Sequence, residues 1–199
     1  MTNKKNFWKR LSSGQYIDLG NLKEEDLNIK DVEASLNFIP RFTGHHKDED
    51  PLTVAQHSYL CYYMAQLFEP DEYKLHLACL THDFAESIIG DVSSPIKWAM
   101  GDSWYNFAIP IERIFEKKFY GNYVDQEMHD RVKMYDLAAL DIERRVLWSS
   151  QYGKDKWPAS PLNVGTIEDK KNLFYMAKSL PFVLLEDLWI GAYDLANSM

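Results

Sequence analysis

Cysteine is scarce in this chain, and no two cysteines are closely spaced. Cys61 and Cys79 are the only ones among 199 residues, which excludes a disulfide framework and a zinc-finger type of site. Apolar runs of about 20 residues, the length that crosses a bilayer, are absent as well. The opening MTNKKNFWKR carries charges with no apolar core behind them. We therefore expect a cytoplasmic protein with no signal peptide and no membrane partner.

Positive charge is also in short supply. The chain has 22 lysines and arginines against 30 aspartates and glutamates, a formal net charge of −8. Because a phosphate polymer requires a basic surface, this balance argues against a nucleic-acid polymer as the partner. A few local cations could still bind a small anion. The hydrophobic content of 46% is that of a globular protein.

Long alternating strand patterns and internal repeats are missing, and helical periodicity dominates. A capping box of Thr53 and Gln56 opens one expected helix, while Gly90 and Gly121 are expected to end two others. The pattern predicts an all-α protein. The helices are expected at 30–38, 51–68, 71–90, 109–121, 125–148 and 166–197, the last bent or broken at Pro181.

Polar residues lie on three of the helical stripes that otherwise face the core. They are His57 on the first, His82 and Glu86 on the second, and Asp136 and Glu143 on the third. Burying such groups without partners costs several kcal/mol, so they must satisfy one another. Three packed helices can bring them to one point. Imidazoles and carboxylates meeting there would form a site for a divalent transition metal.

Each of these residues has a purely structural alternative. His57 could be a hydrogen-bonded core histidine. Asp136 could be an ion-pair partner of Arg131 or Lys133, and Glu86 could pair with the histidine one helical turn earlier. Together, the residues are harder to explain in this way, and the metal site is the preferred interpretation. The remaining histidines, expected mainly at the surface, are His45, His46, His76 and His129, with substrate contact as the alternative for His45 and His46.

With His57, His82–Asp83 and Asp136, the chain resembles the HD phosphohydrolase superfamily, which is named for an H…HD…D pattern. The resemblance extends to RFTGH at 41–45, VAQHS at 54–58, HDFAESIIGDVSSPIK at 82–97 and KMYDLAALDIE at 133–143. It implies one compact helical bundle over residues 1–199. Its metal-site core would span about 40–150 and its C-terminal helices about 166–198.

Within the superfamily, the chain resembles the small nucleotide-cleaving members. SGQYIDLGNL, RFTGH and VAQHS are most similar to viral dATP triphosphohydrolases, which cut dATP to deoxyadenosine and triphosphate. The alternative is a bacterial 5′-deoxynucleotidase acting on deoxynucleoside monophosphates, and a more remote one is a non-catalytic nucleotide sensor. A di-iron oxygenase would need further histidines, which are missing after Asp83. The resemblance also implies a homo-oligomer, a dimer or a hexamer.

The same resemblance implies the metal ligands and the reaction. His57, His82, Asp83 and Asp136 would hold one divalent ion, such as Zn²⁺, Co²⁺, Mn²⁺ or Fe²⁺, with a second Mg²⁺ as an option. A metal-activated water would attack the α-phosphorus.

Three acidic residues have expected roles around that ion. Glu86 is the candidate to orient or deprotonate the water. Asp91 could protonate the 5′-oxygen, bind a second cation or touch the sugar. Glu143 is expected to orient a ligand or a basic residue and not to act on the substrate.

The expected substrate contacts are basic and aromatic. Arg41, Lys97 and Lys133 match basic positions of the family and would neutralise phosphate charge. Tyr16 could stack on the base. Members of the group often have a basic residue where this chain has Gln15, which leaves one phosphate contact without its cation.

Overall fold

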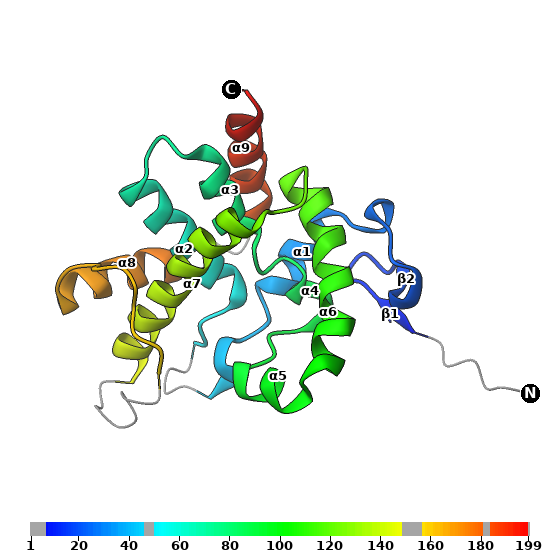
Figure 1. The fold of residues 1–199 in the computed structure, drawn as a ribbon, viewed down its shortest axis with the longest axis horizontal. Coiled ribbons are helices and arrows are strands. Elements are labelled where there is room, and N and C mark those ends of the chain that lie inside the picture. The colour runs from blue at the N-terminus through cyan, green and yellow to red at the C-terminus, as the bar shows by residue number, and fades with distance from the viewer. Residues whose placement is uncertain (1–6, 46–49, 149–156, 181–183, 199) are drawn as a thin grey trace, which may run out of the picture.

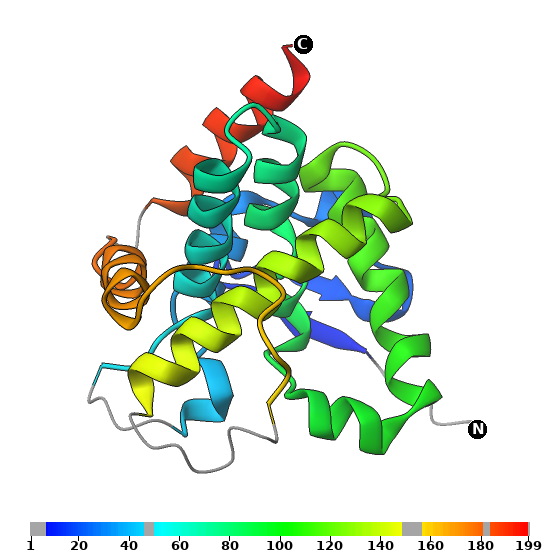
Figure 2. The same ribbon diagram turned by 60° about the vertical axis from the view of Figure 1, so that its left-hand side comes forward.

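A bundle of helices with one small hairpin forms the protein, as the computed structural model shows for residues 7–45, 50–148, 157–180 and 184–198 (Figure 1). Helices α2 (Val54–Phe68) and α3 (Tyr73–Thr81) lie side by side, and α7 (Gln126–Leu147) crosses them (Figure 2). The all-α prediction is confirmed. The other elements are β1 (Trp8–Arg10), β2 (Tyr16–Asp18), α1 (Ile29–Leu36), α4 (Glu86–Ile89), α5 (Ser94–Met100), α6 (Asp102–Phe115), a π-helical turn (Glu116–Tyr120), α8 (Ile167–Lys178), α9 (Leu185–Asn197) and three short 3-10 turns (Leu19–Asn21, Glu24–Asp26 and Arg41–Gly44).

The starts of α2 and α7 are fixed by side-chain caps. Thr53 Oγ1 accepts a hydrogen bond from the Gln56 amide at 3.3 Å, and Gln56 Oε1 accepts one from the Thr53 amide at 3.0 Å. This is the predicted capping box. At α7, Asp125 Oδ1 accepts from the Met128 amide at 2.8 Å. Both caps set the register in which the polar residues of these helices face inward.

The predicted continuous helix over residues 71–90 is wrong. Helix α3 ends at Thr81, a tight turn follows, and α4 begins at Glu86. In the turn, the amide of Phe84 bonds the carbonyl of Thr81. Neighbouring residues of a regular α-helix point about 100° apart. The turn removes this constraint, so that two consecutive side chains, those of His82 and Asp83, reach the same point.

The predicted boundaries of α6 and the absence of strands also need correction. Helix α6 begins at Asp102 instead of near residue 109, which puts Pro110 inside the helix and not in its first turn. The predicted end at Gly121 is confirmed, with φ at 88° in the left-handed region. Strands β1 and β2 pair antiparallel over three residues each, too short to give an alternating pattern.

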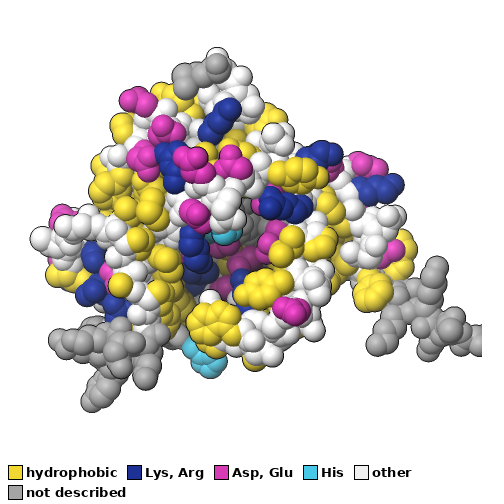
Figure 3. All heavy atoms as spheres, viewed as in Figure 1, with side chains coloured by type: hydrophobic (Ala, Val, Ile, Leu, Met, Phe, Trp, Pro, Cys, Tyr) yellow, Lys and Arg dark blue, Asp and Glu magenta, His cyan; other side chains and the backbone are white. Residues whose placement is uncertain are grey.

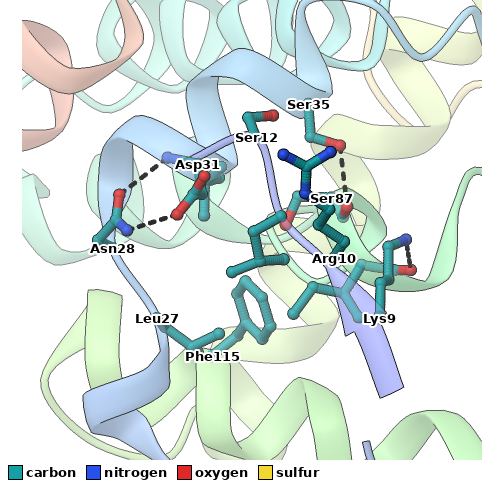
Figure 4. Close-up of a pocket in the computed structure, with 12 residues that line it drawn as sticks. Lys9, Arg10, Ser12, Leu27, Asn28, Asp31, Ser35, Ser87 and Phe115 are labelled. Atoms are coloured by element: carbon teal, nitrogen blue, oxygen red, sulfur yellow. Dashed lines mark hydrogen bonds between the residues drawn. The ribbon is translucent and has the colours of Figure 1, made fainter. Parts of the chain in front are cut away.

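The amino-terminal segment holds α4 in place. Ser35 Oγ donates to the Ser87 carbonyl at 2.8 Å, and Lys9 Nζ donates to the Ile88 carbonyl (Figure 4). These contacts border a cavity of about 60 Å³. They fix the short helix that carries Glu86. Within the described ranges, no helix has both the length and the hydrophobicity needed to cross a lipid bilayer.

A buried carboxylate joins α7 to α8. The side chain of Asp141 is 4% exposed and accepts hydrogen bonds from Arg144, Arg145 and Lys170 at 2.8 Å each. Burial alone would raise the pKa of Asp141, but the three cations outweigh it and lower the pKa to about 2.

We expect Asp141→Asn to lower the free energy of unfolding at pH 7 by about 2 to 3 kcal/mol, because three cations lose their counter-charge. The folded pKa of Asp141 lies below the unfolded value of about 3.9. Its stabilisation is therefore fully present above that value and lost as the pH falls toward about 2. Urea unfolding at several pH values should show the two proteins converging at low pH. Asp130→Asn, an exposed change on the same helix, is the control. A pH-independent difference would contradict the ion-pair explanation.

Candidate metal centre

The centre is built around His57, a fully buried residue of α2. Its Nδ1 lies 2.6 Å from Glu143 Oε1. Because an ionised carboxylate only accepts, Nδ1 is the donor. The opposite nitrogen, Nε2, lies 3.3 Å from Asp136 Oδ1 and 3.6 Å from Asp83 Oδ2. Glu143 thus orients the ring so that Nε2 faces two carboxylates.

His82 completes the group from the turn after α3. Its Nδ1 donates to the Cys79 carbonyl at 2.8 Å, and its Nε2 lies 3.2 Å from Asp83 Oδ2. The rings of His57 and His82 are 5.3 Å apart between centroids. The structure thus brings together the four predicted metal ligands, which come from distant parts of the chain.

The donor atoms have the spacing and the free valences that a metal ion needs. Two nitrogen or oxygen donors of one tetrahedral ion are roughly 3.4 Å apart. The separations of 3.2 to 3.6 Å between the carboxylate oxygens and imidazole nitrogens match this value. His82 Nε2 is buried and makes no hydrogen bond with the described residues. The residues therefore fit a divalent ion with nitrogen and oxygen ligands.

The imidazoles and carboxylates of the centre shift one another's pKa values. Burial raises the pKa of Asp83 and Asp136, but the nearby imidazoles outweigh it and the pKa of each carboxyl is lowered. Burial lowers the pKa of His57, but neighbouring groups, Glu143 and Asp136 among them, raise it well above its ordinary value. A metal ion must displace the proton from His57. Metal affinity should therefore fall as the pH is lowered.

Glu86 and Asp91 form the acidic wall beside these ligands. Glu86 is buried, its Oε1 lies 3.9 Å from Lys97 Nζ, and its Oε2 has no hydrogen-bond partner among the described residues. Burial raises the pKa of Glu86 well above its ordinary value, and the nearby charges of Asp83 and Asp91 raise it further. Burial likewise raises the pKa of Asp91. Glu86 pairs with a lysine and not with the earlier histidine.

Arg41 lies between Asp91 of this acidic wall and Glu143. Its guanidinium is 3.7 Å from Asp91 and 3.4 Å from Glu143. Burial lowers the pKa of Arg41, but these carboxylates outweigh it and the pKa is raised overall. The next two residues, Phe42 and Thr43, both have positive φ, at 55° and 56°. Such a conformation is uncommon for residues with side chains. The RFTGH segment therefore adopts a specific turn that buries Arg41 beside the centre.

Lys97 and Lys133 border the centre from two helices. Lys97 of α5 lies over the ring of Trp104, and Lys133 of α7 pairs with Asp136 one turn later. Arg131, the alternative partner of Asp136, instead binds two glutamates that follow α2. In the view of Figure 3, acidic and basic side chains gather around a hollow between α7 and the α5–α6 pair.

Tyr16 does not join this group. It is 62% exposed on β2, while the next residue, Ile17, points into the core. No contact of the described residues links Tyr16 to the metal centre. Gln15 Nε2 lies 3.5 Å from the Asp26 carbonyl. Base stacking by Tyr16 therefore stays a prediction.

The other histidines divide between core and surface. His76 was expected at the surface, but it is buried and its Nε2 donates to the Glu69 carbonyl at 2.7 Å. His129 and His45 are exposed, as expected. His46 lies outside the described residues.

Sequence reasoning gave no role to one residue of the centre, Cys61. Its buried sulfur lies 3.7 Å from His57 Nε2. The sulfur and one nitrogen each of His57 and His82 all lie within 4.8 Å of one another. The signal was in the sequence, since Cys61 follows His57 by four residues on the same stripe.

The comparisons with known proteins agree with this geometry. Residues 34–139, more than half of the chain, match the HD domain family, and the match includes all four predicted ligands. The chain belongs to the HD-domain family. The family match and the donor set are consistent with a divalent metal centre.

Two curated relatives are similar over part of their length. An uncharacterized protein of Rhodobacter capsulatus is 32% identical over 101 residues, which cover 50% of this chain and 52% of the relative. The uncharacterized protein YfdR of Escherichia coli is 33% identical over 135 residues, which cover 68% of this chain and 69% of the relative. The chain thus spans about half of the first and about two thirds of the second.

Proposed function

We propose that this chain is a metal-dependent phosphohydrolase of deoxynucleotides that cuts dATP to deoxyadenosine and triphosphate. The observation that carries the proposal is the meeting of two imidazoles and two carboxylates at one partly buried point, bordered by basic side chains. His57, His82, Asp83 and Asp136 would hold the ion. When bound, it would supply a Lewis acid that activates water and polarises a phosphoryl oxygen.

The acidic wall supplies the proton transfers. Glu86 has an unpartnered oxygen and a raised pKa, which suit a base that takes a proton from the attacking water. The water oxygen bonds to the α-phosphorus while the bond from phosphorus to the 5′-oxygen breaks. Asp91, whose pKa burial also raises, suits the acid that gives a proton to the departing 5′-oxygen.

The charges of the centre favour the binding of a polyphosphate only when a divalent metal ion is also bound. Carboxylates outnumber cations at the centre by five to three, so by themselves they would repel phosphate. A divalent ion brings the balance to neutrality. Lys97 and Lys133 lie on different helices and could contact different phosphates of an extended triphosphate. The groups are Asp83, Glu86, Asp91, Asp136 and Glu143 against Arg41, Lys97 and Lys133.

Product analysis with dATP and, separately, dAMP tests the proposal. The purified protein would be loaded with Zn²⁺, Co²⁺ or Mn²⁺, with Asp83→Ala as the blank. We expect deoxyadenosine and triphosphate from dATP, with dAMP left intact. Orthophosphate from dAMP with dATP untouched would show a 5′-deoxynucleotidase instead. Survival of both substrates with every metal would contradict catalysis and favour a nucleotide-sensing module.

A further inference from the structure

The thiol of Cys61 lies inside the metal centre. The residue is fully buried on α2, one turn after His57. Its sulfur is 3.7 Å from His57 Nε2, and it lies within 4.8 Å of one donor nitrogen each of His57 and His82. Three groups able to bind a metal therefore converge here, and one of them is sulfur.

The orientation of His57 decides which way this thiol faces. Glu143 occupies Nδ1 of His57, so Nε2 faces the side where Asp83, Asp136 and Cys61 lie. The thiol thus approaches the same nitrogen edge as the two carboxylates. Among the described residues, the sulfur of Cys61 makes its hydrogen bond with His57 Nε2.

Metal binding removes that hydrogen bond. Once His57 Nε2 has lost its proton and gives its lone pair to a metal ion, it can neither donate to nor accept from the Cys61 sulfur, which then lacks this partner in a dry environment. A sulfur and a nitrogen donor bound to one zinc ion, at about 2.3 and 2.0 Å from it, are roughly 3 to 3.6 Å apart. The observed 3.7 Å is close to this separation. A small shift of the sulfur would bring it to the ion, so that it would again have a partner, now as a metal ligand.

We propose that Cys61 Sγ is a donor to the metal ion and makes the centre prefer thiophilic ions such as Zn²⁺, Co²⁺ and Cd²⁺ over Mn²⁺ and Mg²⁺. On coordination, the thiol releases its proton to solvent and the sulfur gives an electron pair to the ion, with no change of oxidation state. Sulfur ligands select such ions, while oxygen ligands suit Mn²⁺ and Mg²⁺. This inference rests on the metal centre of the proposed function.

Cys79 provides a matched control. It is the only other cysteine of the chain, and it is also free and fully buried. Its carbonyl orients His82, but its thiol is not in the donor group formed by His57, Cys61 and His82. A serine at this position keeps the carbonyl and removes the sulfur.

The test is a Co²⁺ titration of the metal-free protein, followed by absorption spectroscopy. Wild type and Cys79→Ser should show a near-ultraviolet sulfur-to-cobalt charge-transfer band. Cys61→Ser should bind cobalt without that band, and its affinity for Cd²⁺ should fall by about tenfold or more relative to Mn²⁺. Cys61→Ala serves in the same way if the serine variant does not fold, as judged by circular dichroism.

Three results would overturn the inference, and they do so in two different ways. If the wild type binds one cobalt ion per chain without the band, or if the band persists in the Cys61 variants, the sulfur is not a ligand although the metal centre stands. If the wild type binds no divalent ion by calorimetry, the metal centre fails, and the proposed function fails with it.

Discussion

Asp136→Ala is expected to abolish tight metal binding and to lower kcat/KM by about 10³-fold or more, which corresponds to about 4 kcal/mol of transition-state stabilisation. Asp136 Oδ1 faces His57 Nε2 at 3.3 Å, and its other oxygen pairs with Lys133. Alanine removes a charged ligand and leaves an excess of positive charge. The remaining donors would then hold a divalent ion far more weakly.

Metal content and calorimetric titration measure this effect directly, and circular dichroism checks that the variant folds. Asp130→Ala is the matched control, because Asp130 lies on the same helix with 70% of its side chain exposed. It should bind metal and turn over substrate like the wild type. If Asp136→Ala retained one tightly bound ion per chain, the assignment of Asp136 as a ligand would be wrong.

Glu86→Gln is expected to lower kcat by about 10²- to 10³-fold while metal binding and KM change little. Glutamine has nearly the shape of glutamate but cannot take the proton of the attacking water. The side chain is buried, and its pair with Lys97 is long, at 3.9 Å. The loss should therefore come from chemistry and not from the fold.

The pH profile separates a base from a structural residue. A base is inactive when protonated, so wild-type kcat should rise as the pH increases through the pKa of Glu86, which is raised above the ordinary glutamate value by burial, Asp83 and Asp91. The variant should lack this rise, so the ratio of wild-type to variant kcat should grow with pH. Glu25→Gln, an exposed change, should leave the profile unaltered. A ratio that is constant with pH would rule out proton transfer by Glu86.

The amino-acid pattern predicted much of the helical framework. The capping box at Thr53 and the left-handed glycine at Gly121 are local signals, because each depends on residues within one turn of the chain. The helix over 126–147 was predicted for a different reason, because its hydrophobic periodicity is long and regular. The two three-residue strands were missed because such short segments carry little pattern. The start of α6 was misplaced because Pro110, a residue typical of a first turn, lies inside this helix.

The sequence by itself thus determined the all-α class, the family pattern and the polar residues that had to meet. Only the tertiary structure decided how they meet. The break after Thr81 lets the adjacent side chains of His82 and Asp83 reach one point, which a regular helix forbids. The position of Cys61 relative to both histidines, and that of Arg41 between Asp91 and Glu143, likewise depend on packing between segments far apart in the chain. Periodicity reports which face of a helix is buried, but it contains no information on which distant side chain lies opposite that face.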